Sequence, residues 1–86
     1  MGDVRLHVAD AAIASVAAAA ARAVPGVFAP RADVAPELVR VAIVTRLGDN
    51  CRDMAEAVQR NVTRTLVEQT GQTAQVEVTV AEVLLT

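Results

Sequence analysis

Two runs of alternating apolar residues, with a helical stripe between them, constrain this chain more than any other feature. The larger apolar side chains fall at every second position in residues 39–43 and 76–80, which predicts two strands with one buried face each. Between these runs, residues 51–66 repeat apolar side chains at helical spacing. The chain therefore contains a strand–helix–strand unit. Its 86 residues leave room for one core, so we predict a single domain that covers residues 1–86.

The first part of the chain shows a similar change of period. Residues 4–8 alternate apolar and polar side chains, which predicts a short strand. Residues 10–24 carry a helical apolar stripe filled in with alanine, the best helix former. We expect this helix to end at Pro25-Gly26, because proline cannot continue a helix and glycine readily adopts the left-handed conformation that closes one.

The segment that joins the two halves has no sustained period. Residues 27–37 include Pro30 and Pro36, and proline is tolerated in sheets only at edges and bulges. We therefore predict an extended connector, with a fragment of edge strand near residues 32–35.

The second helix and the last strand carry recognisable boundaries. Asn50 is a good N-cap, Asp53 suits the positive end of a helix, and Gly71 is placed to close the helix. The final alternation loses phase near Ala81, which predicts a bulge or a phase shift in the last strand.

These elements predict an α+β fold in the order β-α-(β)-β-α-β. We expect a mostly antiparallel sheet of three strands, or four if the connector joins it, with two helices packed on one face. A parallel βαβαβ sheet is the alternative that the pattern leaves open.

The composition argues against several classes of function. A net charge of −2 gives no positive field for nucleic acid, and the single aromatic residue offers no stacking surface for RNA. His7 and Cys51 are too few to bind a metal, which needs three or four ligands. Gly48-Asp49-Asn50 lacks the further glycines and the lysine of a phosphate-binding loop. We predict no catalytic, cofactor-binding or metal-binding residues and no enzymatic activity.

Cys51 is the one residue with intrinsic reactivity. Because it lies on the apolar stripe of the second helix, we expect it to act as a small buried hydrophobic residue rather than as a reactive thiol.

The chain is also expected to lie outside the membrane. Its longest apolar stretch, residues 11–21, is well short of the roughly 20 residues that span a bilayer. The N-terminus has no pattern typical of a signal peptide. We predict a cytoplasmic protein with no direct membrane insertion.

If both helices cover one face of the sheet, the other face and the exposed side of the second helix are free to bind protein. The outer sheet face could pair across a dimer axis or simply contact water, and ion pairs on the helix could be solvated. The candidate interface residues on these two surfaces are Arg40, Val44, Arg46, Arg52, Arg60, Arg64, Val67 and Glu77.

The order and spacing of several segments resemble the alkaline shock protein family, also described as general stress or envelope stress response proteins. The resemblance covers residues 8–13, Val24-Pro25-Gly26-Val27, residues 39–48, residues 58–62, and Thr70-Gly71 leading to residues 76–80. Members of the family usually carry a longer, glycine-rich segment and a further strand where this chain has only residues 28–38. The resemblance implies a bacterial, non-enzymatic protein that associates with the envelope through a membrane-anchored partner.

The leading hypothesis for function is therefore an envelope-stress-type scaffolding or protein-interaction module that forms homo-oligomers. The alternative is a small-molecule-sensing regulatory domain of the ferredoxin-like type, which also uses βα units and dimerises through its sheet.

Overall fold

A computed structural model describes residues 2–35, 38–71 and 75–85, with side chains from residue 10 onward. The elements follow the order α1 (Gly2–Arg22), β1 (Phe28–Ala35), β2 (Leu38–Arg46), α2 (Cys51–Thr70) and β3 (Gln75–Leu84). The strands form one sheet in the order β1-β2-β3, with β1 antiparallel and β3 parallel to β2. The predicted α+β class is confirmed, and the sheet is mixed rather than mostly antiparallel. The helical crossover through α2 returns the chain to the end where β2 began, which makes β2 and β3 parallel.

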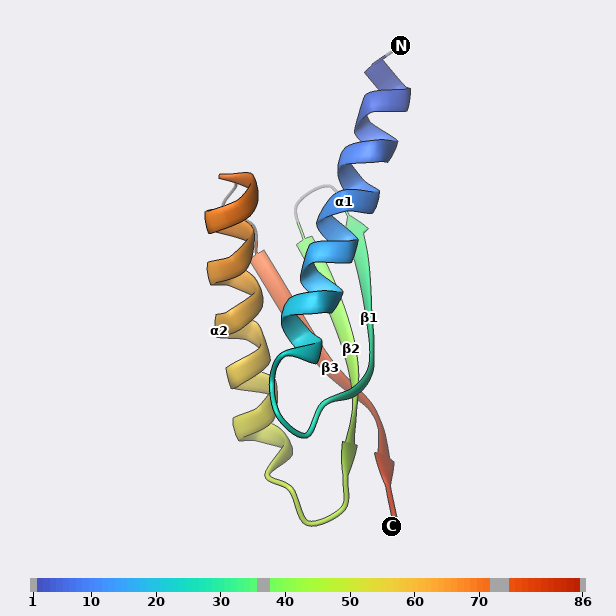
Figure 1. The fold of residues 1–86 in the computed structure, drawn as a ribbon. Helices are drawn as coiled ribbons and strands as arrows, with labels where there is room; N and C mark the ends of the chain where they lie inside the picture. The colour runs from blue at the N-terminus through green and yellow to red at the C-terminus, as the bar shows by residue number, and fades with distance from the viewer. Residues whose placement is uncertain (1, 36–37, 72–74, 86) are drawn as a thin grey trace.

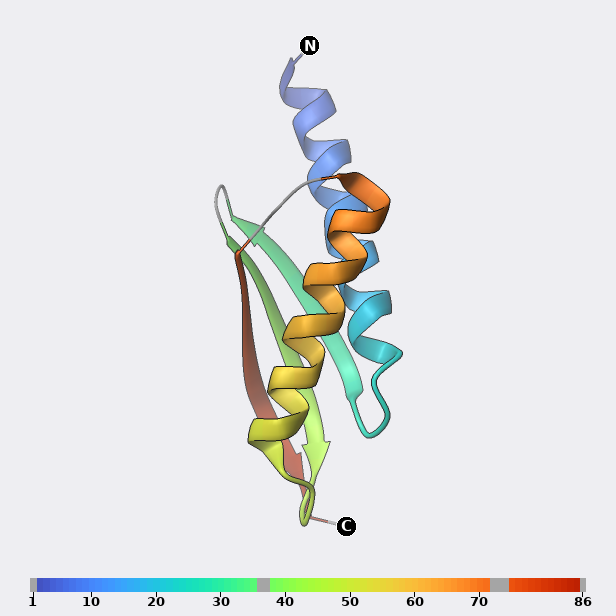
Figure 2. The ribbon, with the colours of Figure 1, turned by 90° about the vertical axis from the view of Figure 1, so that its left-hand side faces the viewer.

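Both helices cover the same face of the sheet, as predicted (Figures 1 and 2). α1 packs against β1 and α2, and α2 packs against β3. The N-terminal turns of α1 extend past the sheet, and the C-terminal end of β3 lies at the opposite end of the molecule (Figure 1). The described part of the chain places no element on the outer face of the sheet.

The predicted strand at residues 4–8 is wrong, because these residues form the first turns of α1. A short alternating run also fits a helix, in which Val4 and Val8 fall one turn apart. No proline or turn residue separates this run from the alanine-rich segment that follows, so the helix continues through it. Arg5 and His7 therefore belong to α1 and not to the sheet.

The predicted connector is a strand over most of its length. The expected edge fragment near residues 32–35 is confirmed, and it belongs to β1, which begins at Phe28. The register shifts between Phe28 and Arg31, where Ala29 has a positive φ of 45° and Pro30 is buried. Because Pro30 has no N–H to donate, this irregular segment fits an edge strand and would be unsuitable in the centre of the sheet.

The predicted ends of α2 are confirmed. The backbone N–H of Asp53 donates to Oδ1 of Asn50 at 3.1 Å, which caps the first turn. At the other end Gly71 has a left-handed φ of 71°, and its N–H donates to the carbonyl of Val67 at 3.0 Å.

The predicted bulge in the last strand is also confirmed. Ile43 pairs with Val80 and the next residue, Val44, pairs with Glu82, which leaves Ala81 out of the register. The bulge divides β3 into a segment of residues 75–80 and a short C-terminal segment.

The core lies between the inner face of β2 and the two helices. Val39, Val41 and Ile43 alternate on β2 and are at most 2% exposed. The helices contribute the other buried side chains: Ala17, Ala20 and Ala21 from α1, and Val58, Val62 and Leu66 from α2. The small alanine side chains allow α1 to approach its neighbours closely, so α1 fills space mainly with backbone.

Among the described residues, a side-chain hydrogen bond joins the two helices. The Nδ2 group of Asn61 on α2 donates to the carbonyl of Ala20 at 2.7 Å. Ala20 lies in the last turn of α1, where carbonyls have no partner within the helix. Arg64 donates in turn to Oδ1 of Asn61 and orients the amide. Asn61 therefore completes the end of α1 while it fixes the distance between the helices.

We expect Asn61→Ala to lower the free energy of unfolding by about 1–2 kcal/mol, because the Ala20 carbonyl would lose its partner in a partly buried position. Chemical denaturation followed by circular dichroism measures this change. Gln69→Ala is the control, since this exposed residue of the same helix should change stability by less than about 0.5 kcal/mol. Equal effects of the two substitutions would show that Asn61 does not tie the helices together.

Candidate protein-interaction surface

The outer face of the sheet brings together side chains from all three strands. The register places Arg40 of β2 between Asp33 of β1 and Glu77 of β3. Nε of Arg40 lies 3.9 Å from Oε1 of Glu77, and both side chains are more than half exposed. The predicted interface residues Arg40 and Glu77 are thus neighbours within one chain.

The middle of this face is apolar. Ala42 and Val44 follow Arg40 along β2, and both remain half-buried although none of the described elements covers them. Phe28 pairs with Val44 across the sheet, and the guanidinium carbon of Arg46 lies 5.1 Å from the centroid of the Phe28 ring. This cation–π contact holds Arg46 over the ring and partly covers it.

A second apolar surface lies at the end where β2 and β3 both finish. Val83 pairs with the buried Thr45, so its side chain lies on the helix side of the sheet, opposite to that of Val44. β2 stops at Arg46, so Leu47 lies beyond it and is 63% exposed. Val83 and Leu85 of the neighbouring segment are 37% and 78% exposed. Three of the four large apolar side chains that are exposed among the described residues therefore cluster here. We call Leu47, Val83, Leu84 and Leu85 the apolar sheet end.

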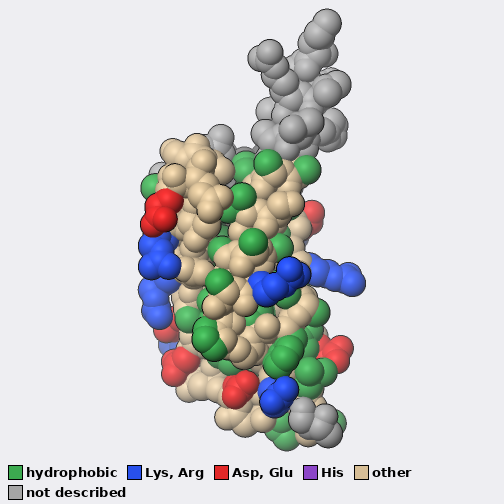
Figure 3. Space-filling view, viewed as in Figure 1, with side chains coloured by type: hydrophobic (Ala, Val, Ile, Leu, Met, Phe, Trp, Pro, Cys, Tyr) green, Lys and Arg blue, Asp and Glu red, His purple; other side chains and the backbone are tan. Residues whose placement is uncertain are grey.

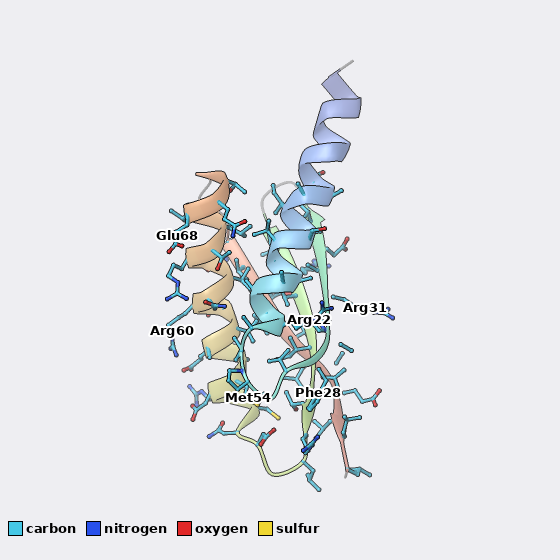
Figure 4. The ribbon with its side chains drawn as sticks, in the orientation of Figure 1. Arg22, Phe28, Arg31, Met54, Arg60 and Glu68 are labelled. Atoms are coloured by element: carbon cyan, nitrogen blue, oxygen red, sulfur yellow. The ribbon has the colours of Figure 1, made fainter. Side chains whose placement is uncertain are left out.

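The remaining predicted interface residues are exposed positions of α2. Figure 3 shows basic and acidic side chains gathered along the outer side of this helix. Arg52 pairs with Glu56 at 3.6 Å, and Arg64 pairs with Glu68 at 3.9 Å. Arg60 and Glu68 point outward from the helix (Figure 4), and Val67 is 45% exposed beside them. The candidates therefore form two separate groups: Arg40, Val44, Arg46 and Glu77 on the sheet, and Arg52, Arg60, Arg64 and Val67 on α2.

Sequence analysis missed Phe28 and Arg31, which reach the outer face only because β1 joins the sheet. Arg31 pairs with Ala42 in the register and points away from the molecule (Figure 4). The irregular register around Pro30 hides the alternation of this strand, so the sequence carries no clear signal for these two residues.

Cys51 occupies the first turn of α2 and is half-buried, with its thiol next to the sheet. Its Sγ lies 3.3 Å from Oγ1 of Thr45, and the Thr45 side chain is completely buried. The thiol therefore serves as the hydrogen-bond partner of a buried hydroxyl, a role that goes beyond the simple hydrophobic packing expected from the sequence.

We expect Cys51→Ala to lower the free energy of unfolding by about 1–2 kcal/mol, because it leaves the Thr45 hydroxyl buried without this partner. Thr45→Val in the same chain should recover much of the loss, since both polar groups are then removed. A double-mutant cycle by urea denaturation measures the coupling. Strictly additive effects would contradict the contact.

In the part of the chain whose side chains are described, no three His, Cys, Asp or Glu residues lie close enough to hold a metal ion. The side chain of His7 lies outside that part. Neither described helix is long and apolar enough to cross a membrane.

Comparison with family models, with curated proteins and with solved structures finds no match for this chain. The resemblance to the alkaline shock protein family and the alternative of a sensing domain therefore both stay predictions.

Proposed function

We propose that this domain is a non-enzymatic scaffolding module of the envelope-stress type, which binds protein through the outer face of its sheet. One observation carries the proposal: the described helices both pack on one side, so a three-stranded sheet with an apolar centre is left uncovered. An uncovered sheet face of this kind is a common site of protein association. The envelope-stress assignment is supported by the sequence motifs alone.

The charge pattern of the outer face favours protein as its partner. The register places three basic side chains and three acidic side chains on this face: Arg31, Arg40 and Arg46, and Asp33, Glu77 and Glu82. A balanced set does not favour the polyanionic surface of nucleic acid. It suits a protein surface, on which mixed charges surround an apolar centre.

The solvent side of α2 is the weaker candidate. Its arginines Arg52 and Arg64 already pair with glutamates one turn away. Exposed pairs at this spacing are common on solvated helices and contribute little energy. Among the described residues of this helix, Val67 is the one large apolar side chain that is exposed, so little apolar surface would be buried there.

We expect the purified domain to self-associate with increasing concentration and Val44→Glu to weaken this association at least about tenfold, because a carboxylate would be buried at the centre of the interface. Sedimentation over a hundredfold concentration range measures the effect. Val67→Glu is the matched control, since it makes the same change on α2 and should leave association unchanged. Loss of association in Val67→Glu alone would move the interface to the helix, and a monomeric wild type would overturn self-assembly.

In cells, we expect part of the protein to sediment with membranes and Val44→Glu to release it, because the sheet face would hold a membrane-anchored partner. Fractionation with Val67→Glu as the control tests this second role. Equal membrane fractions for both variants would exclude the outer face as the site of attachment.

A further inference from the structure

The two segments of β3 differ in whether a helix covers their free edge. Along residues 75–80, α2 overhangs the strand, and Nε2 of Gln59 donates to the carbonyl of Val76 at 3.1 Å. The amide of Gln59 occupies the position that an N–H of a further strand would take. A helix that covers an edge in this way protects it from pairing with another chain.

The segment after the bulge is not covered in this way. A bulge increases the local twist of a strand and redirects it. In Figure 1 the C-terminal end of β3 lies well apart from α2, on the far side of β2. Val83 and Leu85 are exposed on this segment, and Leu47 is exposed beside it.

The backbone of this segment directs free hydrogen-bonding groups away from β2. The N–H of Leu47 donates to the carbonyl of Leu84 at 2.6 Å, so the backbone N–H and C=O groups of Leu84 point toward β2. Successive strand residues direct their backbone groups to opposite sides. The N–H and C=O groups of Val83 therefore point away from β2, toward the free edge of the sheet, where a further strand could bind.

We infer that a second copy of this chain pairs with this segment in antiparallel orientation, about a two-fold axis at Val83. In this register Val83 faces Val83 of the second copy, Glu82 faces Leu84, and Ala81 faces Leu85. The pairing covers the apolar sheet end of both copies and continues the sheet across them. It rests on the proposed function in that it supplies one interface of the proposed self-association.

The charges of the outer face agree with this register. Within the described residues, neither Arg46 nor Glu82 makes an ion pair. Arg46 is the register neighbour of Leu84, and Glu82 of the second copy would lie on the other side of Leu84. Two strand spacings separate their Cα atoms by about 10 Å, so the two long side chains can meet across Leu84 once Arg46 turns away from the Phe28 ring. Opposite charges thus meet twice, and no like charges face each other.

Val83→Pro tests the hydrogen bonds of this interface. Because the N–H of Val83 points away from β2, proline should remove the donor to the second copy while it leaves the sheet of each copy intact. We expect the dissociation constant of the dimer to rise at least about tenfold, and Val83→Ala, which keeps the N–H, to have a smaller effect. Circular dichroism checks the fold of both variants. Unchanged association in a folded Val83→Pro variant would overturn the inference.

Disulfide trapping tests the register independently of that variant. In a Cys51→Ser background, mixing Glu82→Cys with Leu84→Cys should give a covalent heterodimer, because facing residues of a non-hydrogen-bonded pair lie within disulfide distance. Either variant alone should cross-link several-fold less. The control is a mixture of Glu77→Cys and Thr79→Cys, which places the same spacing on the segment that α2 covers.

The outcomes separate this inference from the proposed function. A heterodimer specific to the Glu82/Leu84 mixture supports the interface at Val83. Equal cross-linking of the control mixture, or preferred self-linking of Leu84→Cys, overturns the stated register. If the wild type associates and Val44→Glu weakens it, but no specific heterodimer forms, the proposed function stands and the second interface falls. A wild type that remains monomeric and uncross-linked removes both.

Discussion

The structure depends on the packing of two helices against one face of β2. Val39, Val41 and Ile43 form the buried side of this central strand, and both helices meet over it. The core has no aromatic side chain, so it is thin and relies on close approach of small residues. The alanines of α1 allow that approach, and Asn61 holds α2 at the matching distance. No described element covers the opposite face of the sheet, which is therefore open to solvent or to a partner.

The same arrangement determines which parts of the two sheet edges are protected from pairing with another strand. β1 is made unsuitable for pairing by the buried Pro30 and by the register shift beside it. The first part of β3 is covered by α2, with Gln59 bound to the Val76 carbonyl. The bulge at Ala81 then takes the last residues of β3 out of this protection. The exposed apolar side chains lie at the end of the sheet where neither a proline nor a helix protects the edge. The apolar sheet end is therefore the part of the edge that can associate with another chain.

Much of the fold follows from local patterns in the sequence. The period of residues 39–43 and 76–80 predicts β2 and β3, and the caps at Asn50 and Gly71 predict the ends of α2. These predictions succeed because the signals are long or chemically specific. Residues 4–8 mislead because a run this short fits both a strand and a helix, and the helical segment that follows decides between them.

The candidate surface is less predictable, since it depends on which residues become neighbours across strands. Arg40 and Val44 can be assigned to an outer face from alternation alone. Phe28 and Arg31 cannot, because their strand has an irregular register and carries proline. The exposure of Leu47 likewise depends on where β2 stops relative to the turn before α2.

The sequence by itself determined the class of the fold, the strand–helix–strand unit, the helix caps, the bulge and the absence of a strong charge imbalance. These are properties of local periodicity, backbone conformation and composition, which act over a few residues. Only the tertiary structure decided that β1 completes the sheet, that β2 and β3 are parallel, and that Cys51 meets Thr45. Each of these depends on contacts between residues in different elements, where the energy of burial and pairing outweighs local preference.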